Sequence, residues 1–234
     1  MNSSSEIAIP RQPLGIAALD TLLGGGLPEG NCLLVQGAPG TGKTLLGMQF
    51  LYEGATRFDA PGLLVTFEEA PCRLFRDARA LGWDFERLAG EGRLQIVYTS
   101  PTVFLKELEA DHYGRFCRDH GIRRILVDNL SVLDSCMAQA EGARTRSLRM
   151  VNGLRQDDLM VMLLRESVAH AGPFPVTPDE YVADTIIQLE YRAVAGRRVR
   201  LLEILKNRGS AHSEACHRFV IAPSGLQIDE TLFA

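Results

Sequence analysis

The sequence has few cysteines, and they are poorly placed for cross-linking or metal binding. The five cysteines among 234 residues are Cys32, Cys72, Cys117, Cys136 and Cys216. Their number is odd, their spacing is wide, and no Cys-x-x-Cys pair occurs. Disulfide frameworks and structural zinc sites normally use even, closely spaced sets of cysteines. We therefore expect free thiols and a reducing, cytoplasmic location.

Long apolar runs are also missing. The longest, such as residues 159–164, extend over about half a dozen residues, whereas a membrane-spanning helix needs roughly 20. Residues 1–13 are polar, contain an arginine and two prolines, and lack the apolar stretch of a secretory signal. These absences predict no membrane partner, and a flexible tail (1–13) followed by a single domain (14–234).

Positive charge is not in excess either. The formal net charge is −4 and the isoelectric point is about 5.8. Proteins whose main role is to hold nucleic acid are usually basic, although a local basic patch can lie on an acidic protein. The charge balance therefore argues against a nucleic-acid partner, but only weakly.

What is present is a regular alternation of strand-like and helix-like segments. Short apolar runs predict buried strands at 33–36, 62–67, 93–98, 125–127 and 159–164. Apolar residues at helical spacing predict helices at 43–57, 71–81, 103–120 and 144–156. This rhythm predicts an α/β fold with a mostly parallel central sheet and helices on both faces.

The last third of the chain departs from this rhythm. Strand-like segments at 184–191 and 199–206 flank Ala195-Gly196, which is typical of a hairpin. Two shorter segments, 217–221 and 226–228, suggest a second pair. We therefore expect the sheet to end in antiparallel hairpin strands.

A glycine-rich motif stands between the first of these strands and the helix that follows it. Residues 37–44 read Gly-Ala-Pro-Gly-Thr-Gly-Lys-Thr, and such glycines let the backbone bend closely around phosphate groups at a helix N-terminus. Lys43 brings a full charge to the β- and γ-phosphates of ATP, and the Thr44 hydroxyl can bind Mg²⁺. The expected nucleotide-binding residues are Gly37, Ala38, Pro39, Gly40, Thr41, Gly42, Lys43, Thr44 and Leu45.

Carboxylates follow two other predicted strands. Asp128 ends the strand at 125–127 and is expected to hold Mg²⁺ through a water molecule. Glu68 and Glu69 end another strand, and parallel strands finish at the same edge of a sheet, so one of these glutamates can orient or deprotonate a water molecule. Alternatively, the pair complements the dipole of the helix at 71–81, and both roles are compatible.

Four further stretches form a combination that is more specific than the phosphate loop alone. They are Gly-Ile-x-x-Leu-Asp-x-Leu-Leu-Gly-Gly-Gly-Leu-Pro-x-Gly (15–30), Phe-Glu-Glu-Ala-Pro with Leu-Gly-Trp-Asp (67–71 and 81–84), Glu-Tyr-Val-Ala-Asp (180–184) and Leu-Lys-Asn-Arg-Gly-Ser-Ala-His (205–212). This combination resembles the KaiC-like ATPases of the RecA superfamily. The resemblance covers roughly residues 15–228.

The resemblance implies homo-oligomeric rings, commonly hexamers, with ATP between subunits. A Lys-x-Arg-x-Ser/Thr-x-His segment from one subunit then completes the site of the next. If these roles are carried over to this chain, Lys206 and Arg208 would approach the γ-phosphate in trans. The same nucleotide would be lined by Ser210, His212 and the Asn207 backbone. From the residues alone, Lys206 and Arg208 can equally be solvated charges, since residues i and i+2 share a strand face.

This chain departs from the family's clock proteins in two ways. Those proteins fuse two such domains, whereas this sequence has the length of one. Their kinase-type domains carry adjacent Ser and Thr before the late strand, where this chain has Glu180 and Tyr181, and Thr177 is out of register. The first departure argues against a fused-domain clock mechanism, and the second argues against autokinase activity. We expect an ATPase with slow turnover.

Three functions remain open at this stage. The first is an ATPase in signalling or regulation, with Glu68 slightly preferred over Glu69 as the base because of the resemblance. The second is a non-hydrolytic, ATP-dependent scaffold that binds a signalling protein. The third is a DNA-recombination accessory, for which residues 135–146 and 168–178 are candidate loops. The basic hairpin Arg192, Arg197, Arg198 and Arg200 is more typical of a solvated or subunit-facing surface.

Overall fold

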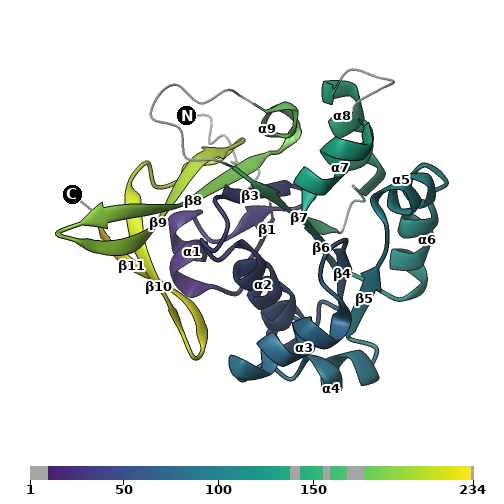
Figure 1. The fold of residues 1–234 in the computed structure, drawn as a ribbon, viewed down its shortest axis with the longest axis horizontal. Helices are drawn as coiled ribbons and strands as arrows, with labels where there is room; N and C mark the ends of the chain where they lie inside the picture. The colour runs from purple at the N-terminus through teal and green to yellow at the C-terminus, as the bar shows by residue number, and fades with distance from the viewer. Residues whose placement is uncertain (1–9, 138–142, 155–158, 168–176, 233–234) are drawn as a thin grey trace, which may run out of the picture.

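A large sheet runs through the middle of the protein (Figure 1). The computed structural model describes residues 10–137, 143–154, 159–167 and 177–232. Nine strands form this sheet in the order β11-β10-β9-β8-β3-β7-β6-β4-β5, and β1 and β2 form a separate two-stranded ribbon. The strands are β1 Arg11–Gln12, β2 Leu27–Pro28, β3 Cys32–Gly37, β4 Gly62–Thr66, β5 Leu94–Tyr98, β6 Arg124–Asp128, β7 Met160–Glu166, β8 Thr185–Val194, β9 Arg197–Asn207, β10 Cys216–Ala222 and β11 Gly225–Leu232.

The strand directions confirm the predicted α/β class. Strands β5, β4, β6, β7, β3 and β8 are parallel to their neighbours, and β8, β9, β10 and β11 follow as antiparallel strands. The turn between β8 and β9 falls at Ala195 and Gly196, where the sequence predicts it.

Helices cover both faces of the sheet. They are α1 Ala17–Leu22, α2 Lys43–Arg57, α3 Pro71–Ala80, α4 Phe85–Gly90, α5 Pro101–Glu109, α6 His112–Asp119, α7 Leu130–Met137, α8 Ala143–Leu154 and α9 Pro178–Val182. Apolar residues of α1 to α4 pack on one face, and those of α5 to α9 pack on the other. Among the described residues no helix is long and apolar enough to cross a membrane.

Strand β3 lies at the centre of this arrangement and determines where the site forms. All six of its residues are buried, and it pairs in parallel with β7 on one side and β8 on the other. A strand buried on both faces needs a continuous apolar run, which Cys32–Val35 supplies. Its carboxyl end, at Gly37, therefore opens at the same edge of the sheet as the ends of β6 and β7.

The predicted helix at 103–120 is wrong, because the segment forms two helices. Helix α5 starts earlier, where the Ser100 side chain accepts a hydrogen bond from the Val103 N–H at 3.3 Å and Pro101 takes the first helical position. It ends before Asp111, which has a left-handed φ of 56°. A left-handed residue cannot continue a right-handed helix, and the helical spacing of apolar residues on both sides conceals this break.

The candidate DNA-contacting loops are only partly described. Residues 135–137 belong to α7 and residues 143–146 to α8, so the ends of the first expected loop, 135–146, are helical. Residues 138–142 and 168–176 lie outside the described residues, and Pro178 begins α9.

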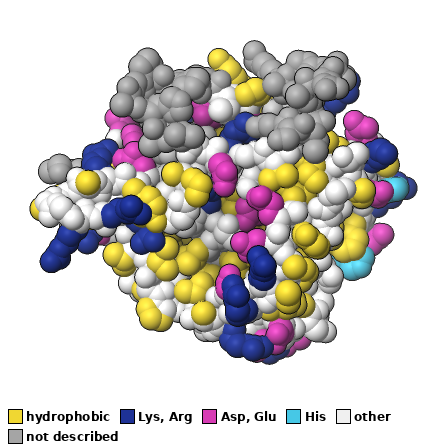
Figure 2. All heavy atoms as spheres, in the orientation of Figure 1, with side chains coloured by type: hydrophobic (Ala, Val, Ile, Leu, Met, Phe, Trp, Pro, Cys, Tyr) yellow, Lys and Arg dark blue, Asp and Glu magenta, His cyan; other side chains and the backbone are white. Residues whose placement is uncertain are grey.

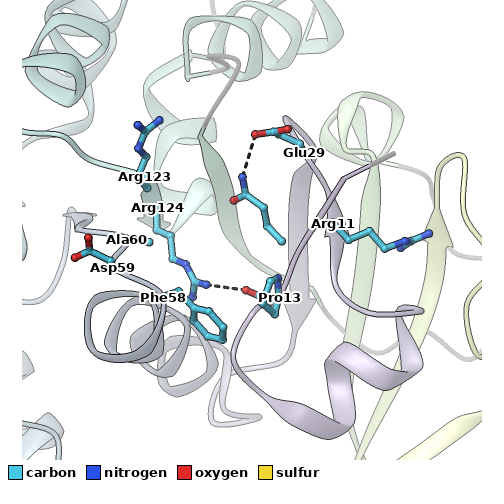
Figure 3. A pocket seen from close by; sticks show the side chains of 9 residues that line it. Arg11, Pro13, Glu29, Phe58, Asp59, Ala60, Arg123 and Arg124 are labelled. Atoms are coloured by element: carbon cyan, nitrogen blue, oxygen red, sulfur yellow. Dashed lines mark hydrogen bonds between the residues drawn. The ribbon is translucent and has the colours of Figure 1, made fainter. Parts of the chain in front are cut away.

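The ordered fold begins earlier than expected, because Arg11 and Gln12 form β1 instead of belonging to a flexible tail. The buried side chain of Arg124 secures the residues that follow. It donates to the backbone oxygens of Pro13 at 2.7 Å, Leu14 at 2.8 Å and Phe50 at 2.5 Å. Figure 3 shows the bond to Pro13 beside a cavity of about 460 Å³. Residues 1–9 lie outside the described part of the chain.

Helix α2 approaches Arg124 so closely that only glycine fits at Gly54. A Cβ there would lie 2.4 Å from Arg124 Cδ. Gly54→Ala should therefore lower the free energy of unfolding by about 2 kcal/mol, despite alanine's better helix propensity. Gly90→Ala, with nothing within 4 Å, is the matched control and should be neutral or stabilising. Urea unfolding measures both, and equal stability of the two variants would contradict the packing argument.

Candidate nucleotide-binding site

The glycine-rich loop joins the end of β3 to the start of α2. A Cβ at Gly37 would lie 2.3 Å from the Leu189 backbone oxygen, so a side chain has no room there. Gly40 and Gly42 have positive φ values of 79° and 111°, which favour glycine. The Thr41 hydroxyl donates to the Ala38 oxygen at 2.8 Å and closes the loop on itself. The local sequence is therefore the one that this tight loop requires.

The N-terminus of α2 faces the same loop. Its N-cap is Gly42, and no side chain caps the first turn of the helix. The N–H groups of that turn have no partner within the helix, and the helix dipole makes this end positive. Such a terminus suits phosphate oxygens.

The Lys43 ammonium lies inside the loop. Lys43 is buried, and its Nζ donates to the backbone oxygens of Gly37 at 2.9 Å and Ala38 at 3.1 Å. Burial lowers the pKa of Lys43, while the negative charges of Glu166 and Asp128 raise it. This charge is held close to the position that phosphate groups would occupy.

Thr44 and Asp128 meet next to the loop. The Thr44 hydroxyl donates to Asp128 Oδ2 at 2.7 Å. Burial raises the pKa of Asp128 to about 6, the Thr44 hydrogen bond and Lys43 lower it, and Glu69 and Glu68 raise it. A hydroxyl and a carboxylate fit Mg²⁺ when phosphate oxygens supply other ligands. Among the described residues no group of three or more His, Cys, Asp or Glu could hold a metal alone.

The predicted glutamates lie at the same edge. Strand β4 pairs with β6 so that Thr66 lies beside Asp128. Glu68 is exposed, and its Oε2 accepts a hydrogen bond from Asn129 Nδ2 at 2.9 Å. The Glu69 N–H donates to the Thr66 hydroxyl at 3.3 Å. Figure 2 shows acidic side chains gathered near the middle of this face of the molecule.

Sequence reasoning missed two polar residues here. Asn129 donates a hydrogen bond to Glu68. The negative charge of Glu166, at the end of β7, raises the pKa of Lys43. Glu166 is the last residue of β7, as Asp128 is of β6, and it stands two positions after an apolar run, so a similar pattern could have identified it. The contact of Asn129 joins residues 61 positions apart, and no sequence pattern indicates it.

Tyr191 is a further residue that the sequence did not indicate. Its hydroxyl donates to the Gly40 backbone oxygen of the phosphate loop. Arg198 and Arg200 lie over its ring, with guanidinium carbons 4.9 and 5.2 Å from the ring centre. Two arginines of the basic hairpin therefore pack on a residue of the nucleotide site. Figure 2 shows positive side chains near the projecting end of β8 and β9.

The residues expected to act in trans lie at the end of β9 and in the turn after it. Lys206 Nζ donates to the backbone oxygens of Glu180 at 3.1 Å and Ala183 at 2.6 Å. Burial and the neighbouring Arg208 lower the pKa of Lys206. Arg208 is exposed and donates to Asp184 Oδ1 at 3.3 Å.

Three more of these residues complete the group. Asn207 is buried, and its Oδ1 accepts a hydrogen bond from the Thr185 hydroxyl at 2.9 Å, so its side chain is turned into the fold. Ser210 Oγ accepts a hydrogen bond from Arg11 at 2.7 Å. His212 is half-buried.

This group lies far from the phosphate loop of its own subunit. Asn207 pairs with Thr185, and Thr185 pairs with Leu33 near the start of β3. The loop begins at Gly37, four residues further along that strand, which corresponds to about 13 Å. The group also lies two strands to the side of β3. The structure therefore brings together the loop, Asp128 and the two glutamates, and separates them from the expected trans residues.

The phosphate loop between β3 and α2, with carboxylates from neighbouring parallel strands at the same edge, defines a P-loop protein of the RecA-like fold. The family profile described as "ATPase: KaiC" matches residues 12–232. The chain belongs to the KaiC family of ATPases.

Named relatives extend the comparison. The circadian clock oscillator protein KaiC of Synechococcus elongatus is 34% identical over 238 residues, which cover 97% of this chain and 46% of that protein. The circadian clock oscillator protein KaiC 1 of Synechocystis is 34% identical over 224 residues, covering 91% of this chain and 43% of that protein. Circadian clock protein KaiC2 of Synechocystis is 30% identical, covering 97% and 41%. The chain spans less than half the length of these relatives.

Proposed function

We propose that this chain binds ATP with Mg²⁺ and hydrolyses it slowly at the interfaces of a homo-oligomeric ring, with a hexamer as the expected size. The observation that supports this most directly is the distance between the 206–212 segment and the phosphate loop within one subunit. Arg208 is a positively charged, exposed side chain that follows β9, two strands to the side of β3 and about 13 Å along the sheet from its own phosphate loop. A neighbouring subunit can bring such a group to the nucleotide, so hydrolysis would require assembly.

The chemistry assigned to each residue follows from its contacts. The loop backbone and Lys43 bind the phosphates, and Lys43, Lys206 and Arg208 offset the charge that develops on the γ-phosphate. Glu68, oriented by Asn129, accepts a proton from or orients the attacking water. Magnesium, held by Thr44 and Asp128, would neutralise phosphate charge.

The proposed role is signalling or regulation, without autophosphorylation. The named relatives are circadian clock proteins, which supports a regulatory role. Glu180 and Tyr181 stand where kinase-type domains have serine and threonine, so the two aliphatic hydroxyls that accept phosphate in those domains are not found at these positions. In this role the ring is proposed to bind a further signalling protein.

Size and turnover measured together test the proposal. Light scattering after size-exclusion chromatography should show a ring with ATP and Mg²⁺ and smaller species without nucleotide. Phosphate release should rise more steeply than linearly with protein concentration, because the competent site needs two subunits. Lys43→Ala is the control, because it removes the lysine that is proposed to bind the phosphates of ATP. A species that remains monomeric and still releases phosphate at a constant rate per subunit would refute trans hydrolysis.

A further inference from the structure

The glycine-rich turn before β2 encloses the Arg11 side chain. Gly24, Gly25 and Gly26 have positive φ values of 72°, 104° and 113°, so three successive residues take a conformation that favours glycine. The turn directs two backbone oxygens at one nitrogen: Arg11 Nη1 donates to Leu23 at 2.9 Å and to Gly26 at 3.0 Å. The turn therefore fixes the position of the guanidinium.

The other side of the guanidinium reaches the segment that carries the trans residues. Arg11 Nη2 donates to Ser210 Oγ at 2.7 Å, across 199 positions of sequence. In Figure 3 the Arg11 side chain extends away from Arg124 and Pro13. Arg11 thus uses its fork to connect the glycine turn to Ser210, which a lysine could not do in the same geometry.

One more hydrogen bond holds the same segment against the turn. The Ser213 N–H donates to the Leu22 backbone oxygen at 3.0 Å. The Ala211 oxygen lies near Gly24 as well, since a Cβ placed on Gly24 would be 3.7 Å from it, although the glycine itself makes no side-chain contact there. Residues 210–213 therefore lie directly on the turn, and Arg11 provides the side-chain link between them.

We infer that Arg11 is a positioning residue, which holds the 206–212 segment of its own subunit in the conformation that a neighbour's ATP requires. This inference rests on the proposed trans hydrolysis. Arg11 acts through Ser210 and contacts no residue of its own phosphate loop in the described structure. Its loss should therefore lower turnover in the neighbouring site and leave ATP binding in its own site intact.

The first measurement does not depend on activity. Without nucleotide, Arg11→Ala should speed hydrogen exchange of the Ser213 amide and its neighbours at least tenfold, with unchanged exchange in β3 and α2. Arg57→Ala is the matched control, because Arg57 also bonds a backbone oxygen near the N-terminus, that of Gly15, but does not touch Ser210. Unchanged exchange at 208–213 in Arg11→Ala would overturn the inference. Ser210→Ala, which keeps the glycine turn intact, should show a smaller effect in the same direction.

Mixed rings identify the subunit in which Arg11 acts. Alone, Arg11→Ala should lose at least tenfold in kcat with little change in KM, and Glu68→Gln should be nearly inactive. Mixed, they should regain turnover, because the Arg11→Ala subunit supplies an intact phosphate loop and Glu68, and the other supplies an intact 206–212 segment. If Arg208→Ala regains turnover with Glu68→Gln but Arg11→Ala does not, this inference alone fails. If neither pair regains turnover, the proposed function fails and the inference falls with it.

Discussion

Replacing Arg208 by alanine should reduce ATP turnover by about a thousandfold or more, while the variant still binds ATP. An arginine supplied by a neighbour stabilises the charge of the transition state, and such residues contribute about 10³–10⁵ in kcat. The Arg208 side chain is exposed, and its guanidinium donates to Asp184 Oδ1 at 3.3 Å, a surface contact that it can exchange for a phosphate oxygen. Nucleotide binding should change little, because the loop and Lys43 of each subunit remain intact.

Binding and turnover must be measured separately in this variant. Calorimetry gives the ATP affinity, and phosphate release gives kcat. Arg218→Ala is a suitable control, since it removes another exposed arginine from the neighbouring strand β10 but leaves the 206–212 segment unchanged. Arg208→Lys should restore little, because an ammonium cannot bind a phosphate with two parallel hydrogen bonds. Wild-type turnover in Arg208→Ala would show that the residue is only a solvated charge.

The sequence predicts the parts of the site that depend on neighbouring residues. The loop at 37–44 and the helix at 43–57 have local patterns, and the structure places the strand, the loop and α2 where these patterns indicate. Asp128 follows a buried strand, and parallel strands end together, so its position beside Thr44 also follows from the sequence.

The remaining contacts join segments that are far apart in the chain. Tyr191 reaches Gly40 across 151 positions, and Arg11 reaches Ser210 across 199. Which side chains meet in this way depends on strand order and register, and a single sequence specifies neither. The predicted helix at 103–120 failed for a different reason, because one left-handed residue, Asp111, interrupts a helical pattern without altering its spacing.

The two adjacent glutamates should differ in their contribution to hydrolysis. The two carboxylates have different surroundings near Thr44 and Asp128, the residues expected to hold magnesium. Asn129 fixes the Glu68 carboxylate at 2.9 Å, whereas Glu69 has the larger electrostatic effect on Asp128, whose pKa burial raises to about 6. A base must be held in a defined orientation, which favours Glu68. A negative charge near Asp128 favours cation binding, so we expect Glu69 to affect magnesium affinity more than the proton transfer.

Glu68→Gln should therefore lower kcat by about 10²–10⁴-fold, the range for loss of a general base, with ATP binding and ring assembly retained. Glu69→Gln should keep kcat within about tenfold and raise the Mg²⁺ concentration needed for half-maximal turnover. Each substitution replaces a carboxylate by an amide of the same shape, and the two positions are adjacent, so each variant is a control for the other. The opposite ranking would make Glu69 the base. The scaffold alternative predicts that Glu68→Gln and Glu69→Gln both assemble and preserve the cellular role without turnover. In that case bound ATP stabilises the subunit interfaces, and hydrolysis is not required for function.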